Sequence, residues 1–153
     1  MNLLQIILIA TISYSALFLG TLLAKIAKEE MTPGKPYFQK MQLLLAIAVP
    51  LSLLLQATTL AAITTIVYLT IWTILHKTKK ETLNYQYALF GLALGIAAQN
   101  INTLAITASL IFLYGLPTGS MMKKKSRINY STLGSLFLGV TLIIFYTTTL
   151  FPQ

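Results

Sequence analysis

MQLLLAIAVPLSLLLQATTLAAITTIVYLTIWTILH, residues 41–76, decides the fold of this chain. These thirty-six residues carry no formal charge unless His76 is protonated. As a single helix they would extend about 54 Å, whereas the hydrocarbon core of a bilayer is roughly 30 Å thick. The stretch therefore has to fold back as two membrane-spanning helices. The break is expected at residues 56–59, where the side chains of Gln56, Thr58 and Thr59 can hydrogen-bond at an interface or cap a helix.

The composition is typical of a membrane protein. Of the 153 residues, 56% are hydrophobic and 9% are charged, and the length accommodates about six helices of roughly 20 residues. We therefore expect one transmembrane domain, residues 1–153. No cysteine is present, so disulfides, thiolate metal sites and cysteine nucleophiles are excluded. The N-terminal segment lacks the basic start of a cleaved signal peptide, and the first helix is expected to remain as a span.

The remaining spans are placed on either side of the central hairpin. The fold predicted is all-α, a polytopic integral membrane protein with six transmembrane helices in three antiparallel hairpins. A polar connection is expected at 25–40, with Pro36 starting the next helix, and Pro117 with Gly119 should end the fifth span. Thr82 or Asn84 can cap the fourth. The four outer spans are expected at 2–27, 85–98, 103–116 and 131–150.

The charge pattern gives the orientation. All eleven lysines and arginines fall within residues 25–40, 77–80 and 123–127, the three long connections. The positive-inside rule makes this face cytoplasmic and places both termini and both tight turns on the opposite side. If residues 41–76 formed one helix in a five-span chain, Lys40 and Lys77 would lie on opposite sides and this segregation would be lost.

A repeat of 44 residues is a further hypothesis. Shifting the chain by 44 pairs Gln42 with Gln86, Thr59-Leu60-Ala61 with Thr103-Leu104-Ala105, and Lys79-Lys80 with Lys123-Lys124. This pattern predicts three hairpins around a pseudo-threefold axis. Shared composition and span length are the alternative explanation.

The spans carry neutral polar groups in place of charges. No Asp, Glu, Lys, Arg or His lies in the middle of a predicted span, so a proton relay through the bilayer centre is not expected. Hydroxyls and carboxamides can line a path for a solute, but hydroxyls often bond to their own helix and amides suit interfacial turns, so both interpretations stay open. The residues of this candidate polar path are Ser52, Gln56, Thr64, Gln99, Asn100, Asn102 and Thr107.

Four glycines are candidates for close helix packing. Gly91 and Gly95 form a G-x-x-x-G motif, and Gly134 and Gly139 lie near the same repeat register on the last span. Small residues at such spacings let two helix backbones approach in lipid. The contact can join two copies of the chain, another membrane subunit, or two helices of one chain. Pro50 is expected to kink the second span.

The cytoplasmic face carries the charged side chains. Lys123, Lys124, Lys125 and Arg127 are expected to bind anionic lipid headgroups, in preference to nucleic acid. Glu29 and Glu30 are one adjacent acidic pair, and His76 suits the C-terminal end of its helix. These groups do not make a metal site or a catalytic set. We therefore expect no enzyme activity, no metal and no cofactor.

Two functions remain open. The first is a small channel or facilitator, expected to be a homo-oligomer, with a charge-free Ser/Thr/Asn/Gln-lined path for a small neutral solute or an ion. The second is a non-catalytic membrane subunit or assembly factor that packs against another membrane protein. Polar groups converging on a water-accessible gap would favour the first function, and an axis filled by apolar side chains would favour the second.

Overall fold

The computed structural model describes residues 2–27, 29, 31–78, 83–121 and 130–150, which form helices and no strand. Four stretches are long and apolar enough to cross a membrane, and α3 contributes a shorter apolar helix. The protein is all-helical and fits a multi-pass integral membrane protein. Its elements are α1 (Leu3–Ile26), α2 (Met31–Ser52), the short 3-10 helix η1 (Leu53–Gln56), α3 (Thr59–Thr78), α4 (Leu83–Ala97), α5 (Ile101–Met121) and α6 (Tyr130–Leu150).

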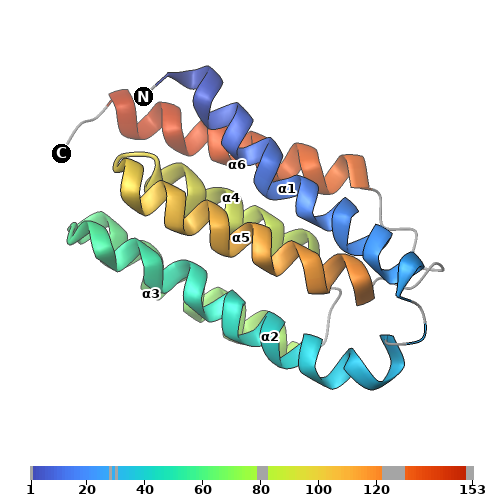
Figure 1. The fold of residues 1–153 in the computed structure, drawn as a ribbon. Helices are drawn as coiled ribbons and strands as arrows, with labels where there is room; N and C mark the ends of the chain where they lie inside the picture. The colour runs from blue at the N-terminus through green and yellow to red at the C-terminus, as the bar shows by residue number, and fades with distance from the viewer. Residues whose placement is uncertain (1, 28, 30, 79–82, 122–129, 151–153) are drawn as a thin grey trace.

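The six α-helices lie side by side, with α4 and α5 between the other two pairs (Figure 1). Helix α1 packs mainly on α5, α6 on α4, and α2 on α5. The start of α1, the end of α6 and the two short turns lie at one end of the bundle, and the other ends of the helices lie at the opposite end (Figure 1). A pseudo-threefold arrangement would give the three helix pairs equivalent positions around an axis. In this layered order one pair lies between the other two, so the order does not confirm the predicted pseudo-threefold arrangement.

The central stretch breaks within the predicted segment. Helix η1 ends at Gln56, and Ala57 adopts the left-handed conformation with φ of 52°. The backbone N–H of Ala57 donates to the Leu54 carbonyl at 3.1 Å, which closes the preceding turn. The Thr58 hydroxyl accepts a hydrogen bond from the Ala61 N–H at 3.2 Å and so caps the start of α3.

Three predicted boundaries are wrong. Helix α2 begins at Met31, so the connection expected at 25–40 is much shorter and Pro36 lies inside the helix. Helix α5 continues through Pro117 and Gly119 to Met121. Helix α4 begins at Leu83, which places Asn84 inside it; Thr82 lies outside the described residues. Proline ends helices less strictly in membranes, where neighbouring helices compensate for the lost hydrogen bond.

Glycines set the two closest helix contacts. A Cβ atom added at Gly119 would collide with the Leu17 carbonyl oxygen of α1, and one at Gly115 would lie 2.8 Å from the Ala16 Cβ. On the other side of the bundle, a Cβ at Gly91 would lie 2.6 Å from the Phe137 carbonyl oxygen of α6. The segment expected to end α5 is therefore the surface on which α1 packs.

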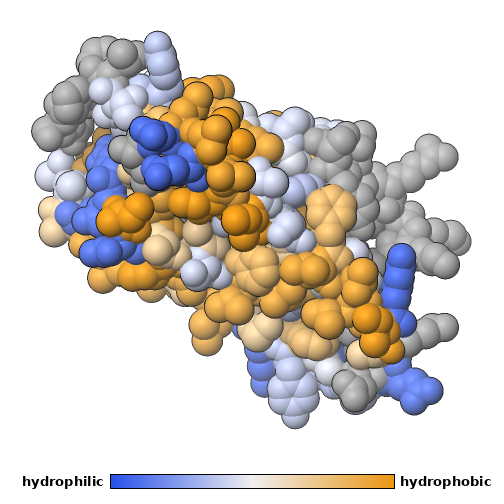
Figure 2. Space-filling view, turned by 45° about the horizontal axis from the view of Figure 1, so that its top comes forward, coloured by the Kyte–Doolittle hydropathy of each residue, from blue (hydrophilic) through white to orange (hydrophobic). Residues whose placement is uncertain are grey.

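Apolar residues dominate the middle of the face shown in Figure 2, and hydrophilic residues gather toward the two ends of the helices. The exposed large side chains of α1 and α3 include Leu8, Ile12, Ile63 and Ile66. An apolar middle between polar ends is the surface that a lipid bilayer solvates.

Candidate functional site

A cavity of about 630 Å³ lies between α2, α3, α4 and α5. It occupies the end of the bundle where α2 and α4 begin and α3 ends. Its size is within the range of about 300–1,000 Å³ common for small-molecule sites. The polar side chains that line it are Gln39, Lys40, Gln42, Trp72, Gln86 and Tyr114.

Gln42 is held across the cavity to α5. Its Nε2 donates to the Thr118 hydroxyl at 2.7 Å, and that hydroxyl donates in turn to the Tyr114 carbonyl at 2.7 Å. Thr118 is buried, at 3% exposure. The Gln42 amide is therefore fixed in position on the cavity wall.

Gln86 carries an unpaired donor on the same wall. The side chain is buried, at 7% exposure, and its Nε2 has no hydrogen-bond partner among the described residues. The Tyr68 hydroxyl lies beside it without a hydrogen bond of good geometry. A buried polar group left unpaired costs about 1–3 kcal/mol. The Gln86 amide is therefore suited to a ligand with a hydrogen-bond acceptor.

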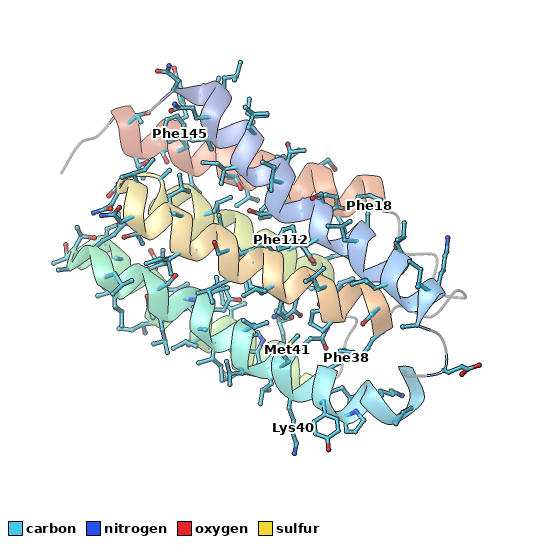
Figure 3. All side chains as sticks on the ribbon, in the orientation of Figure 1. Phe18, Phe38, Lys40, Met41, Phe112 and Phe145 are labelled. Carbon is cyan, nitrogen blue, oxygen red and sulfur yellow. The ribbon has the colours of Figure 1, made fainter. Side chains whose placement is uncertain are left out.

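The rim and the walls differ in character. Lys40 is exposed at the rim, where its side chain extends outward from α2 (Figure 3). The remaining walls are mainly apolar. They include Leu43, Ala46, Leu75, Leu83 and Leu89, together with the ring of Trp72, the one tryptophan of the chain.

A layer of fully buried side chains follows the cavity along all four helices. We call Val49, Tyr68, Phe90 and Ile111 the plug; each is 0% exposed. Phe90 stacks on Tyr68 with ring centroids 6.3 Å apart and meets the Tyr114 ring edge-on at 4.8 Å. The cavity is therefore closed toward the other end of the bundle.

Beyond the plug, α2 and α5 share a buried polar contact. The Ser52 and Thr107 hydroxyls lie 2.8 Å apart, and Ser52 also donates to the Val49 carbonyl at 2.7 Å. One turn further, Gln56 Nε2 donates to the Ile96 carbonyl at 3.2 Å. Three of the predicted path residues thus follow one another in the interface of α2 with α4 and α5.

The other predicted path residues do not join them. The Thr64 hydroxyl bonds to the Leu60 carbonyl of its own helix at 2.8 Å. Asn100 caps α5, because its Oδ1 accepts from the Asn102 N–H at 2.9 Å and the Thr103 N–H at 3.4 Å. Gln99 and Asn102 are exposed at the short turn between α4 and α5.

The predicted packing glycines also separate. Gly91 and Gly95 contact α6, and Gly134 lies against the Tyr14 ring of α1, whose nearest atom would be 3.1 Å from an added Cβ. Gly139 has open space around it within the described structure. The residues predicted to bind lipid headgroups, Lys123 to Arg127, lie outside the described residues.

The cavity itself was not predicted from the sequence. Gln42 and Gln86 are the two glutamines that the 44-residue shift pairs, and both line it. The sequence signal that could have pointed to this site was a glutamine inside an apolar helix and away from any turn. Among the described residues, no three His, Cys, Asp or Glu side chains come together as a metal site would require.

The fold fits a multi-pass integral membrane protein, and the cavity lies at one end of its helices. Comparison of the chain with protein-family models, curated proteins and solved structures finds no match in any of the three.

Proposed function

We propose that all six helices span the membrane, with the lysine-rich connections in the cytoplasm and both termini on the opposite side. The grouping of the basic residues supports this orientation through the positive-inside rule. Helix α4 has 15 residues, fewer than the roughly 20 of an ordinary span. Ten of them are buried between the neighbouring helices, so protein rather than lipid surrounds much of α4.

We infer further that α2 to α5 form a facilitator for a small molecule, closed in the conformation described. One observation carries this proposal: the cavity, the plug and the Ser52–Thr107 pair succeed one another along the same helices. Displacement of the plug side chains would connect the cavity with the far end. Helices α1 and α6 pack on the outside of α5 and α4 and act as the scaffold.

Filling the cavity is expected to stop the flux. The chain is reconstituted in liposomes, and the entry of a panel of small neutral solutes and anions is followed by light scattering or an enclosed dye. At least one solute should enter faster than in protein-free liposomes. Ala46→Phe places a ring at the buried wall of the cavity and should return the rate to the protein-free value.

Ala105→Phe is the matched control, because Ala105 is exposed and outside the cavity lining. If Ala46→Phe and Ala105→Phe are both folded and Ala46→Phe gives the same rate of solute entry as the unaltered chain, the facilitator hypothesis is refuted.

The plug also favours a second candidate, a non-catalytic subunit or assembly factor. Val49, Tyr68, Phe90 and Ile111 are each fully buried where a passage between the two ends would run. The open side of α6 at Gly139 offers a surface for another helix. Purification in mild detergent followed by native mass analysis distinguishes the two hypotheses. A different protein that copurifies in stoichiometric amount supports the subunit, and copies of this chain alone support the facilitator.

A further inference from the structure

We propose that the cavity between α2, α3, α4 and α5 binds one anionic amphiphile, a molecule with a carboxylate or phosphate head and an acyl chain. The inference deepens the proposed function by naming the class of molecule that enters the same cavity. It requires binding only, and it does not depend on passage through the plug.

The volume of the cavity suits an amphiphile better than a very small solute. A cavity of about 630 Å³ is far larger than a hydrated ion or a solute such as urea needs. Sites of about 300–1,000 Å³ enclose molecules of drug or lipid-fragment size. A very small solute would leave most of the apolar wall facing an empty or watery space, and such a wall is better covered by hydrocarbon.

The apolar part of the lining suits an acyl chain. It includes Leu43, Leu75, Leu83 and Leu89. The ring of Trp72 completes it. This surface complements an acyl chain and offers little to a sugar or a free nucleotide, whose hydroxyls would be left unpaired there.

Positive charge favours an anionic headgroup. Lys40 is the cation of the lining and stands exposed at the rim. The chain has eleven Lys and Arg against three Asp and Glu, and the basic residues all fall within residues 25–40, 77–80 and 123–127 of the sequence. A positive juxtamembrane surface concentrates anionic headgroups. A flexible lysine at the rim can then pair with the carboxylate or phosphate while remaining partly in water.

The unpaired donor of Gln86 favours a headgroup with an acceptor oxygen. The Nε2 of Gln86 is buried on the wall with no partner among the described residues. A carboxylate, a phosphate or an ester carbonyl supplies the acceptor that this amide lacks. Binding of such an oxygen removes the penalty of an unpaired buried group, so Gln86 should contribute to affinity as well as to orientation.

The single tryptophan makes binding measurable. The full chain is held in uncharged detergent micelles, and Trp72 fluorescence is followed during titration with a dibrominated fatty acid, dibrominated phosphatidylglycerol or dibrominated phosphatidylcholine. Inorganic phosphate is added as a competitor without an acyl chain. Saturable 1:1 quenching is expected with the anionic amphiphiles, with an apparent Kd about tenfold lower than that for the zwitterionic lipid, and it should weaken as salt rises.

Two variants locate the binding contacts. Gln86→Leu should weaken anionic quenching about tenfold, because it removes a hydrogen bond to a charged group. Its effect on the melting temperature should be small, since the buried Nε2 donor that is lost has no hydrogen-bond partner among the described residues. Lys40→Gln should weaken binding and flatten its salt dependence. Lys25→Gln and Gln99→Leu, at exposed sites outside the cavity lining, should bind as the unaltered chain does.

Each outcome decides between interpretations. A preference for the fatty acid identifies a single-chain carboxylate, and a preference for phosphatidylglycerol identifies a phospholipid. Effective competition by inorganic phosphate would show that the acyl chain is not required, and this result would overturn the proposal. Non-saturating quenching that is equal for all three brominated lipids and in all variants also overturns it. Specific binding of an amphiphile that the reconstituted chain does not transport leaves this inference standing and refutes the facilitator. Flux of a solute without specific binding of any of these amphiphiles does the reverse.

Discussion

Replacing Gly119 with alanine is expected to lower the free energy of unfolding by about 3 kcal/mol, the upper part of the range for overpacked sites. The added Cβ would collide with the backbone carbonyl oxygen of Leu17 and approach the Thr21 nitrogen at 3.0 Å. Backbone atoms of a helix cannot yield as a side-chain tip can, so α1 has to move away from α5. The loss can be measured by unfolding in mild detergent with increasing sodium dodecyl sulfate.

Gly139→Ala is the matched control for this prediction. An added Cβ at Gly139 meets no atom within 4 Å in the described structure. Alanine favours a helix over glycine by about 1 kcal/mol, so this variant should be unchanged or slightly more stable. Equal losses in the two variants would show that α1 and α5 are not in contact at Gly119.

Phe90→Ala should be the most destabilising single truncation in the plug, by about 3–5 kcal/mol. Phe90 is fully buried and contacts the rings of Tyr68, Tyr87 and Tyr114. Helices in lipid gain little from the hydrophobic effect and depend on such packing. The empty volume left by the ring therefore lowers the free energy of unfolding directly. The same denaturation measurement reports the loss.

Under the facilitator hypothesis, Phe90→Ala should also raise solute flux, because it removes the largest apolar side chain of the plug. Phe18→Ala is the control: Phe18 is 49% exposed and lies outside the plug, so a smaller loss of stability and no change in flux are expected. Destabilisation without increased flux would show that the plug is packing alone and would favour the subunit hypothesis.

The central break could be predicted because it follows from length. A charge-free segment longer than the membrane has to turn, and the polar residues near Gln56 marked the place. The end of α5 was mispredicted for a local reason. Gly115, Pro117 and Gly119 resemble a helix stop in isolation, but α1 packs on them and the helix continues. Tertiary packing, which the sequence does not show directly, reversed the local preference.

The candidate site was predictable only in part. Ser52, Gln56 and Thr107 were identified as polar residues in apolar helices, and they do lie along one interface. The cavity depends on how α3 lies relative to α2 and α4, and no pattern within one helix determines that geometry. Gln86 was visible as a repeat match, yet its unpaired amide is a property of the packed structure.

The most direct test of the account is the side of the membrane on which the ends of α2 and α3 lie. The chain contains no cysteine, so single cysteines can be introduced at Lys40, Lys77 and Asn102 without further changes. In sealed vesicles of known orientation, an impermeant maleimide should label the first two positions from the cytoplasmic side and the third from the opposite side. Labelling of positions 40 and 77 from opposite sides would contradict the hairpin, the orientation and the cavity that depends on them.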